Sequence, residues 1–174
     1  MHYYVEIAQM QGKPIICMCV YIFSLFLCKL TDNSQLILFI VICDNKDNEL
    51  EKLKNKERTM LIRGNATRRI PHSRIYVNDE LYFVNKGENV SKDYAKVTNA
   101  DSLSKLTNDE IESLFLKYKD KLNLSDKEEK KWKKKCLCII EFDSVEEIDE
   151  INIPNYTNLE DWIMVNDLEE LNNR

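Results

Sequence analysis

Short apolar runs separated by turn signals constrain the fold of this chain more than any other feature of its sequence. The clearest run is residues 36–43, which is bulky, rich in β-branched residues and bounded by Asp-Asn pairs, so it predicts a buried strand. A short helix is expected over residues 47–56. Later strands are expected in residues 59–63, 75–84, 92–98, 136–142 and 162–165. Because short turns join the strands in the middle of the chain, they favour a mostly antiparallel sheet over a doubly wound parallel one.

Two further helices are expected in the second half of the chain. Thr107 and Glu110 form a capping box, which predicts the start of a helix with an apolar stripe facing the core. Ser125 and Glu128 repeat the pattern and predict a second helix. Trp132 on this helix is expected to dock on the sheet, and the alternative is that it stacks on a nucleic-acid base. The elements together predict an α+β fold, a small, mostly antiparallel β-barrel with helices over its ends.

Basic residues are concentrated in residues 52–74, where eight basic side chains accompany one acid although the net charge of the chain is −5. The acids are concentrated elsewhere, with eleven of them against one base in residues 141–174. Clustered positive charge attracts polyanions whatever the net charge of the protein. Arginine, which binds phosphate in a planar, bidentate geometry, supplies five of the eight basic side chains. The segment is therefore expected to bind a phosphate-bearing ligand, with RNA as the leading candidate.

The candidate binding residues lie on a strand, on the Gly-Asn turn expected after it and on the basic loop that follows. Alternation along residues 59–63 predicts that Leu61 and Arg63 face outward. His72 is interpreted either as an exposed polar residue of the loop or as a general base. The residues expected to contact phosphates, bases or sugars are Arg58, Thr59, Arg63, Asn65, Arg68, Arg69, His72, Arg74, Tyr82 and Lys86.

The six cysteines lie in apolar runs, which favours buried thiols over a zinc site and a zinc site over disulfides. No cofactor is expected. Two C-x-C pairs keep the zinc alternative open, because alternate residues of a strand share one face. The cysteines are Cys17, Cys19, Cys28, Cys43, Cys136 and Cys138.

Residues 1–33 are interpreted as a hydrophobic N-terminal extension of a domain formed by residues 34–174. The extension contains an uncharged apolar stretch, residues 15–28, that is shorter than the about 20 residues a membrane-spanning helix needs. Three interpretations stay open for this stretch: a buried segment, translated sequence upstream of the true start, and, as a minority view, a membrane anchor. A cytoplasmic monomer is expected.

Several short motifs follow one another between residues 35 and 168. They are R-T-M-L-I-R over residues 58–63, Y-V-N-D-E-L-Y-F over 76–83, L-T-x-x-E-I over 106–111, C-I-I-E-F over 138–142 and D-W-I-M-V over 161–165. In this order and spacing they resemble the ASCH domains of the PUA-like superfamily. The resemblance implies a pseudobarrel with a cleft between the barrel and the mid-chain helices, in which RNA or a modified nucleotide binds.

The resemblance also implies an alternative, because some small ASCH proteins are amidohydrolases that act on N4-acetylcytidine with a lysine, a threonine and a glutamate. Aligned on Arg63, the lysine and threonine positions hold Arg58 and Leu61, and the glutamate falls near Glu112 or Leu114. Arginine keeps its proton near neutral pH, and leucine offers no nucleophile. This chemistry therefore requires Lys56 and Thr59 to take over by a shift in register.

A third interpretation rests on the acidic C-terminal part, in which residues 155–162 are a candidate surface for a basic protein partner. The preferred alternative is that they form a solvated connection to the last strand. No nucleotide-binding glycine loop, metal-ligand cluster or serine triad is recognisable in the sequence.

Overall fold

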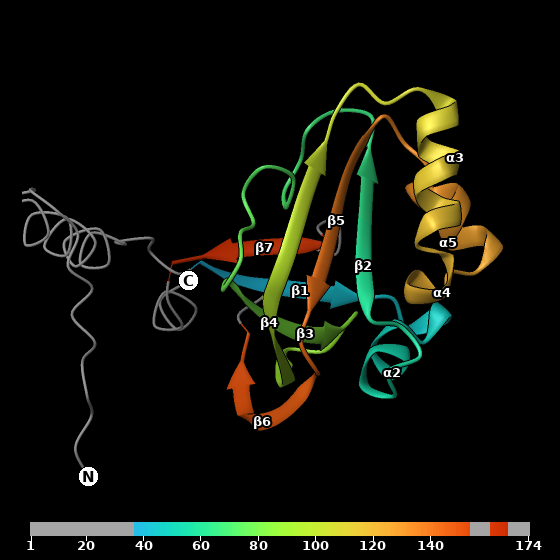
Figure 1. Ribbon diagram of the computed structural model, residues 1–174. Coiled ribbons are helices and arrows are strands. Elements are labelled where there is room, and N and C mark those ends of the chain that lie inside the picture. Colours follow the sequence, from blue (N-terminus) through green and yellow to red (C-terminus); the bar gives the residue numbers. More distant parts are fainter. Residues whose placement is uncertain (1–36, 154–160, 167–174) are drawn as a thin grey trace, which may run out of the picture. The chain divides into compact units, whose positions relative to one another are not determined.

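The computed structural model of the protein describes residues 37–153 and 161–166 (Figure 1). The expected N-terminal extension, residues 1–33, lies outside the described residues, and with it the apolar stretch and three of the cysteines. Most of the candidate surface for a basic partner also lies outside them, because residues 155–160 of its range 155–162 are not described. Within the described ranges, no helix has the length and apolar character needed to cross a membrane.

Seven strands form one sheet in the described part of the chain, in the order β2-β5-β4-β3-β1-β7, with β6 paired to β4. Strands β1 and β3 run parallel, and every other neighbouring pair is antiparallel, as the short turns predicted. The strands are β1 (Leu38–Cys43), β2 (Met60–Asn65), β3 (Glu80–Asn85), β4 (Val90–Leu103), β5 (Cys136–Phe142), β6 (Glu146–Asn152) and β7 (Trp162–Val165).

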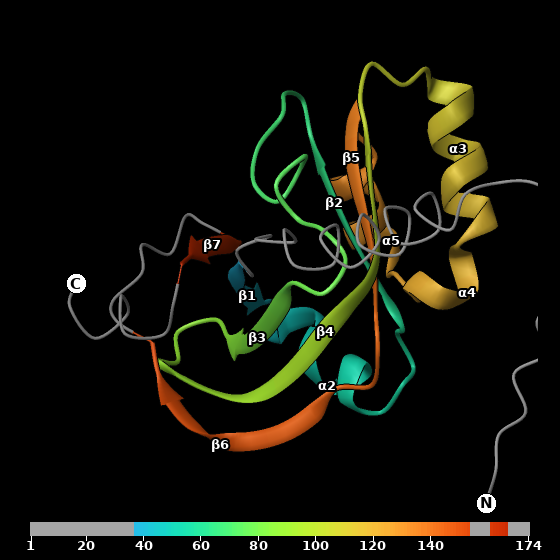
Figure 2. The ribbon, with the colours of Figure 1, turned by 60° about the vertical axis from the view of Figure 1, so that its left-hand side comes forward.

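The sheet curls into a half-barrel because β4 takes part in both of its halves. The first part of this 14-residue strand pairs with β3, and its last part pairs with β5. The register shifts between Val97 and Asn99, where the strand passes from one half to the other. Such a bulge increases the local bend and twist, and Figure 2 shows β4 bending along its length.

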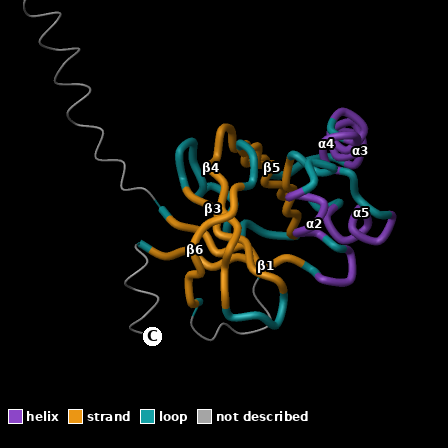
Figure 3. The backbone as a smooth tube through the Cα atoms, turned by 90° about the horizontal axis from the view of Figure 1, so that it is seen from below, coloured by secondary structure: helices purple, strands orange, loops and turns teal. Residues whose placement is uncertain are grey.

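Helices α3, α4 and α5 gather beside β2 and β5 (Figures 1 and 3), whereas α2 packs against β3 and forms an ion pair with β4 through Lys54 and Asp93. Both expected capping boxes are confirmed: the side chains of Thr107 and Ser125 accept from the backbone N–H of Glu110 and Glu128. The long helix expected after Thr107 is divided in two at Tyr118. The helices are η1 (Asn45–Asp47), α2 (Glu49–Lys54), α3 (Asn108–Lys117), α4 (Lys119–Leu122) and α5 (Asp126–Trp132).

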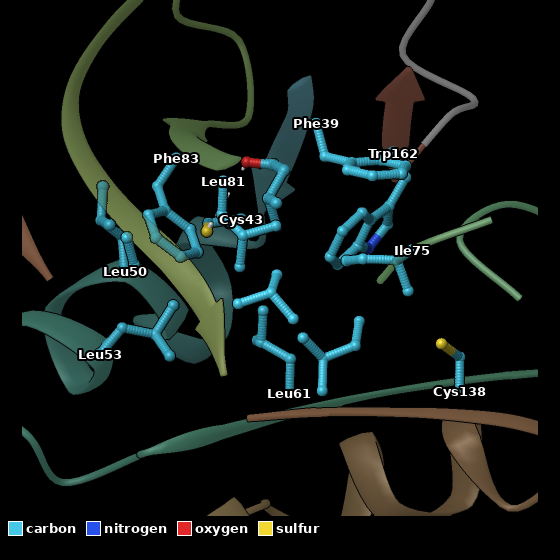
Figure 4. Close-up of a cluster of buried hydrophobic side chains, with 14 residues drawn as sticks. Phe39, Cys43, Leu50, Leu53, Leu61, Ile75, Leu81, Phe83, Cys138 and Trp162 are labelled. Carbon is cyan, nitrogen blue, oxygen red and sulfur yellow. Dashed lines mark hydrogen bonds between the residues drawn. The ribbon is translucent and has the colours of Figure 1, made fainter. Parts of the chain in front are cut away.

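One hydrophobic cluster fills the interior of the curled sheet (Figure 4), and another packs helices α3, α4 and α5 on the outer face of β2 and β5. Leu61 belongs to the first cluster, whereas Met60 and Ile62 belong to the second. Burying a side chain of this size stabilises the fold by about 1.5–3 kcal/mol. Strand β2 is thus covered on both faces, so the outward orientation expected for Leu61 and Arg63 is wrong.

Two further segments differ from the expectation. Gly64 and Asn65 are the last residues of β2 and do not form a turn. Strand β6, which pairs along the first part of β4, is not among the strands that the sequence predicts. Most side chains of β6 are exposed, so the strand lacks the apolar residues that identify a buried strand.

The described cysteines are expected to react with iodoacetamide in a defined order. Cys43, Cys136 and Cys138 carry free thiols, and only Cys136 is partly exposed. Burial raises the pKa of Cys43 well above its usual value and that of Cys138 to about 11. Because the thiolate is the nucleophile, Cys136 should be alkylated first in the folded protein near neutral pH. Peptide mass spectrometry over time measures the order, and equal rates at the three thiols would contradict the buried positions.

Candidate functional site

A close approach between β2 and α5 builds the site. Gly64 lies directly against the end of α5, so that a Cβ atom at Gly64 would sit 1.8 Å from the carbonyl oxygen of Trp132. No other residue allows the two backbones to come this near. The approach places the side chains on either side of Gly64, those of Arg63 and Asn65, next to Trp132.

Arg63 lies between two tryptophan rings and is only 4% exposed. Its guanidinium carbon is 4.7 Å from the ring centre of Trp132 and 5.7 Å from that of Trp162. Nη2 donates to Glu49 Oε1 at 2.9 Å, and Nη1 donates to the carbonyl oxygen of Ile62 at 3.0 Å. Burial disfavours the charged guanidinium, but the carboxylates of Glu49 and Asp161 outweigh this cost, so the pKa of Arg63 lies above its usual value.

Arg58 lies in the interior, 1% exposed, in an ionic cluster formed by Glu49, Arg58, Arg63 and Glu128. Its Nη1 donates to Glu49 Oε1 at 3.3 Å and its Nη2 to Glu128 Oε1 at 2.7 Å. The two arginines and two glutamates balance in charge, which is the condition under which buried ions are tolerated. The guanidinium of Arg58 is therefore committed to carboxylates and does not face an external phosphate.

A hollow of about 300 Å³ opens beside this cluster, and we call it the tryptophan hollow. Its volume suits a single nucleobase or nucleoside, at the lower end of the range of ligand pockets. Two of the residues that line it carry a buried donor, Nε of Arg63 and Nε1 of Trp162, that has no hydrogen-bond partner among the described residues. The hollow is lined by Arg63, Asn65, Arg69, Ile70, Trp132, Asp161 and Trp162.

The basic loop, residues 66–74, extends from the tryptophan hollow and exposes three guanidinium groups. Arg68, Arg69 and Arg74 are all exposed, and Arg69 also lines the hollow. Nε of Arg68 donates to Oγ of Ser104 at 3.1 Å, which ties the loop to the end of β4. His72 fixes the loop from beneath, 7% exposed, with Nε2 3.0 Å from the carbonyl oxygen of Leu103. The exposed position expected for His72 is therefore wrong.

The remaining predicted residues lie away from the tryptophan hollow. Thr59 is exposed just before β2, at the end of the strand opposite Asn65, where its amide donates to the carbonyl oxygen of Lys121. Lys86 is exposed in the turn between β3 and β4. Tyr82 packs in a third cluster, in which β1 and β3 meet β6 and β7. The structure thus brings Arg63, Asn65 and Arg69 together at the tryptophan hollow. It places Thr59, Tyr82 and Lys86 elsewhere.

Tyr82 belongs to a larger but acidic hollow of about 940 Å³. The hydroxyls of Tyr82 and Tyr94 both donate to the carboxylate of Glu80, at 3.0 Å and 3.3 Å. Burial and the charge of Glu80 raise the pKa of Tyr94 to about 12. Glu147 and Asp149 also line this hollow. A polyanion is repelled by these carboxylates, so the smaller tryptophan hollow suits a phosphate-bearing ligand better.

Sequence reasoning did not identify Glu49, Asp161 or Trp162 as part of the site. Trp162 begins β7, and Asp161 precedes it, so both reach the site only because β7 pairs with β1. The sequence contains one signal for these residues, which is the presence of arginines on an otherwise apolar strand. Buried arginines require carboxylates nearby, so this pattern indicates that acidic partners come from elsewhere in the chain.

The comparisons with known proteins agree with this fold. No protein-family model matches the sequence, and no curated protein matches it. The crystal structure of ASCH from Zymomonas mobilis is similar, with a TM-score of 0.54 and 11% identity over 74% of this chain and 87% of that chain. Two point mutants of the same protein have a TM-score of 0.56 at 11% identity, covering 76% of this chain and 93% or 91% of theirs. The expected architecture is confirmed: this chain has the α+β fold of the ASCH structures from Zymomonas mobilis.

Proposed function

We propose that the protein binds RNA or a modified nucleotide, with a base or ribose at the tryptophan hollow and phosphates along the basic loop. The observation that carries this proposal is the position of Arg69, which belongs both to the wall of the hollow and to the exposed face of the loop. A ligand that has a ring and a phosphate can therefore contact both parts at once. Phosphate contacts give affinity, and contacts to the base give any specificity.

The walls of the tryptophan hollow match the parts of a nucleotide. Ile70, 43% exposed, provides an apolar side against which a base can lie. Asn65 and Asp161 provide amide and carboxylate groups for the edge of a base. The unpaired donors of Arg63 and Trp162 favour a ligand that brings an acceptor oxygen, because an unsatisfied buried donor costs about 1–3 kcal/mol.

The geometry gives the amidohydrolase alternative no support. Arg58 is held by two carboxylates, and Leu61 lies in the core. Lys56 and Thr59, which would replace them, are exposed before β2 and do not line the tryptophan hollow. Glu112 is exposed on α3 and pairs with Lys133.

Arg68→Ala combined with Arg69→Ala is expected to weaken RNA binding and to flatten its salt dependence. Each phosphate contact to a single strand contributes about 0.7 to the slope of log K against log salt, so the slope should fall by about 1.4. Fluorescence anisotropy of a labelled single-stranded RNA, measured at several salt concentrations with the full chain, gives the slope and the affinity.

Lys117→Ala combined with Lys119→Ala is the matched control. It removes the same charge from exposed positions on α3 and α4, on the helix side of the molecule. The control should keep most of the wild-type slope. An equal loss in both double variants would mean that net charge alone attracts the RNA, and salt-independent binding would argue against the basic loop as the phosphate site.

A further inference from the structure

A serine and a histidine of the basic loop lie in hydrogen-bond contact with each other, outside the tryptophan hollow. Oγ of Ser73 is 2.8 Å from Nδ1 of His72. Ser73 is exposed, whereas His72 is buried beneath it. We propose that Ser73 is an activated nucleophile, with His72 as its general base, that accepts acyl groups from esters or thioesters of phosphate-bearing molecules.

The hydrogen bonds of His72 identify which ring nitrogen carries the proton. Nε2 is 3.0 Å from the carbonyl oxygen of Leu103, and a carbonyl oxygen only accepts, so the proton is on Nε2. Nε2 is also 3.0 Å from Oγ of Ser104, which itself accepts from Nε of Arg68. Nδ1 of the neutral imidazole is then an acceptor, and the hydroxyl of Ser73 donates to it.

This arrangement has the three parts of an activated hydroxyl: a nucleophile, a base and a group that orients the base. In the familiar triads a carboxylate orients the histidine, and here the backbone carbonyl of Leu103 takes that place. No sequence motif identifies this arrangement. The group that orients His72 comes from the end of β4, about 30 residues later in the chain, and meets the loop only in the folded protein.

The backbone holds Ser73 in a sparsely populated conformation. Its φ is 58°, in the left-handed region that favours glycine. The amide of Ser73 donates to Oγ of Ser102 at 2.8 Å, and its carbonyl oxygen accepts from the hydroxyl of Tyr76 at 3.3 Å. Strained residues held from several sides are concentrated at functional sites. Here the strain presents Oγ to solvent and to the imidazole at the same time.

The reaction is a single acyl transfer. Oγ of Ser73 forms a bond to the acyl carbon, the bond from that carbon to the leaving oxygen or sulfur breaks, and the serine proton passes through Nδ1 of His72 to the leaving group. The products are an acylated Ser73 and a free alcohol or thiol. The exposed guanidiniums of Arg68, Arg69 and Arg74 favour substrates that carry phosphate. The step does not require that the protein bind RNA.

A fluorophosphonate probe and p-nitrophenyl acetate test the proposal on the full chain. In each case Ser73 displaces a leaving group, fluoride or nitrophenolate, and remains covalently modified. We expect peptide mass spectrometry to locate the adduct on Ser73 and to find none at that peptide in Ser73→Ala. Because neither probe carries phosphate or a base, failure to label is independent of failure to bind RNA.

Ser113 is the internal reference, because it is exposed on α3 and its Oγ donates only to the backbone carbonyl of Asp109 at 2.7 Å. General-base catalysis is worth about 10²–10⁴-fold, so Ser73 should be labelled at least about 100-fold faster than Ser113. His72→Gln, with folding checked by circular dichroism, should remove most of this advantage. Labelling of Ser73 no faster than that of Ser113 in the folded wild-type protein would overturn the proposal, whatever the fate of the His72 variant.

Discussion

Glu49→Gln is expected to lower the free energy of unfolding by about 3–5 kcal/mol, the cost of breaking a buried ion pair from one side. Oε1 of Glu49 accepts from both Arg58 and Arg63, and Oε2 accepts from the amide of Asp44. Glutamine keeps the size of the side chain but removes its charge. Arg58 then keeps its ion pair with Glu128, but Arg63 loses the carboxylate that it pairs with, so one positive charge is left uncompensated in the interior.

Urea unfolding of the wild type and the variant measures this difference, and Glu51→Gln is the matched control. Glu51 lies on the same helix, α2, but is exposed. A surface substitution of this kind usually changes stability by less than about 0.5 kcal/mol. Equal effects at Glu49 and Glu51 would show that the ionic cluster contributes nothing specific to the fold.

Gly64→Ala is expected to destabilise the protein by about 3 kcal/mol, the upper end of the cost of overpacking. The new methyl group would lie 1.8 Å from the carbonyl oxygen of Trp132 and 3.1 Å from Cδ2 of Leu137. Because the nearest atom belongs to the backbone, a change of rotamer cannot relieve the clash. Helix α5 must move away from β2, and Trp132 then moves away from Arg63.

Gly87→Ala separates this steric effect from a purely conformational one. A Cβ atom at Gly87 meets nothing within 4 Å, but the φ of 95° is unfavourable for alanine. The expected cost is about 1–2 kcal/mol, from the backbone alone. Thermal unfolding of the two variants ranks them. A smaller loss at Gly64 than at Gly87 would contradict the close approach of β2 and α5.

Local sequence signals predicted the elements that local contacts determine. The capping boxes at Thr107 and Ser125 are complete within four residues, so the sequence contains all of their atoms. Glu128 shows where such reasoning ends. Its Oε2 accepts from Ser125, as the motif predicts, but its Oε1 accepts from Arg58, which lies 70 positions away in the chain. Only the tertiary fold reveals that second partner.

The orientation of Arg63 could not be predicted for a related reason. Alternation distinguishes the two faces of a strand but not which face meets solvent. In β2 neither face does, because helices cover one and the curled sheet encloses the other. The buried guanidinium of Arg63 is stabilised by the carboxylate of Glu49 and by the rings of Trp132 and Trp162. These partners come from three other elements, α2, α5 and β7. The arginines of the basic loop, in contrast, are exposed, and one of them, Arg69, lines the tryptophan hollow.

The position of the two tryptophans gives the protein an optical reporter of its own. Trp132 and Trp162 are the only tryptophans in the sequence, and both line the tryptophan hollow. Fluorescence from selectively excited tryptophan therefore originates entirely from residues that line this hollow. The change in tryptophan fluorescence during a titration with nucleosides, nucleotides or short oligonucleotides therefore measures binding at the tryptophan hollow without any label. The same measurement ranks the affinities of all these compounds.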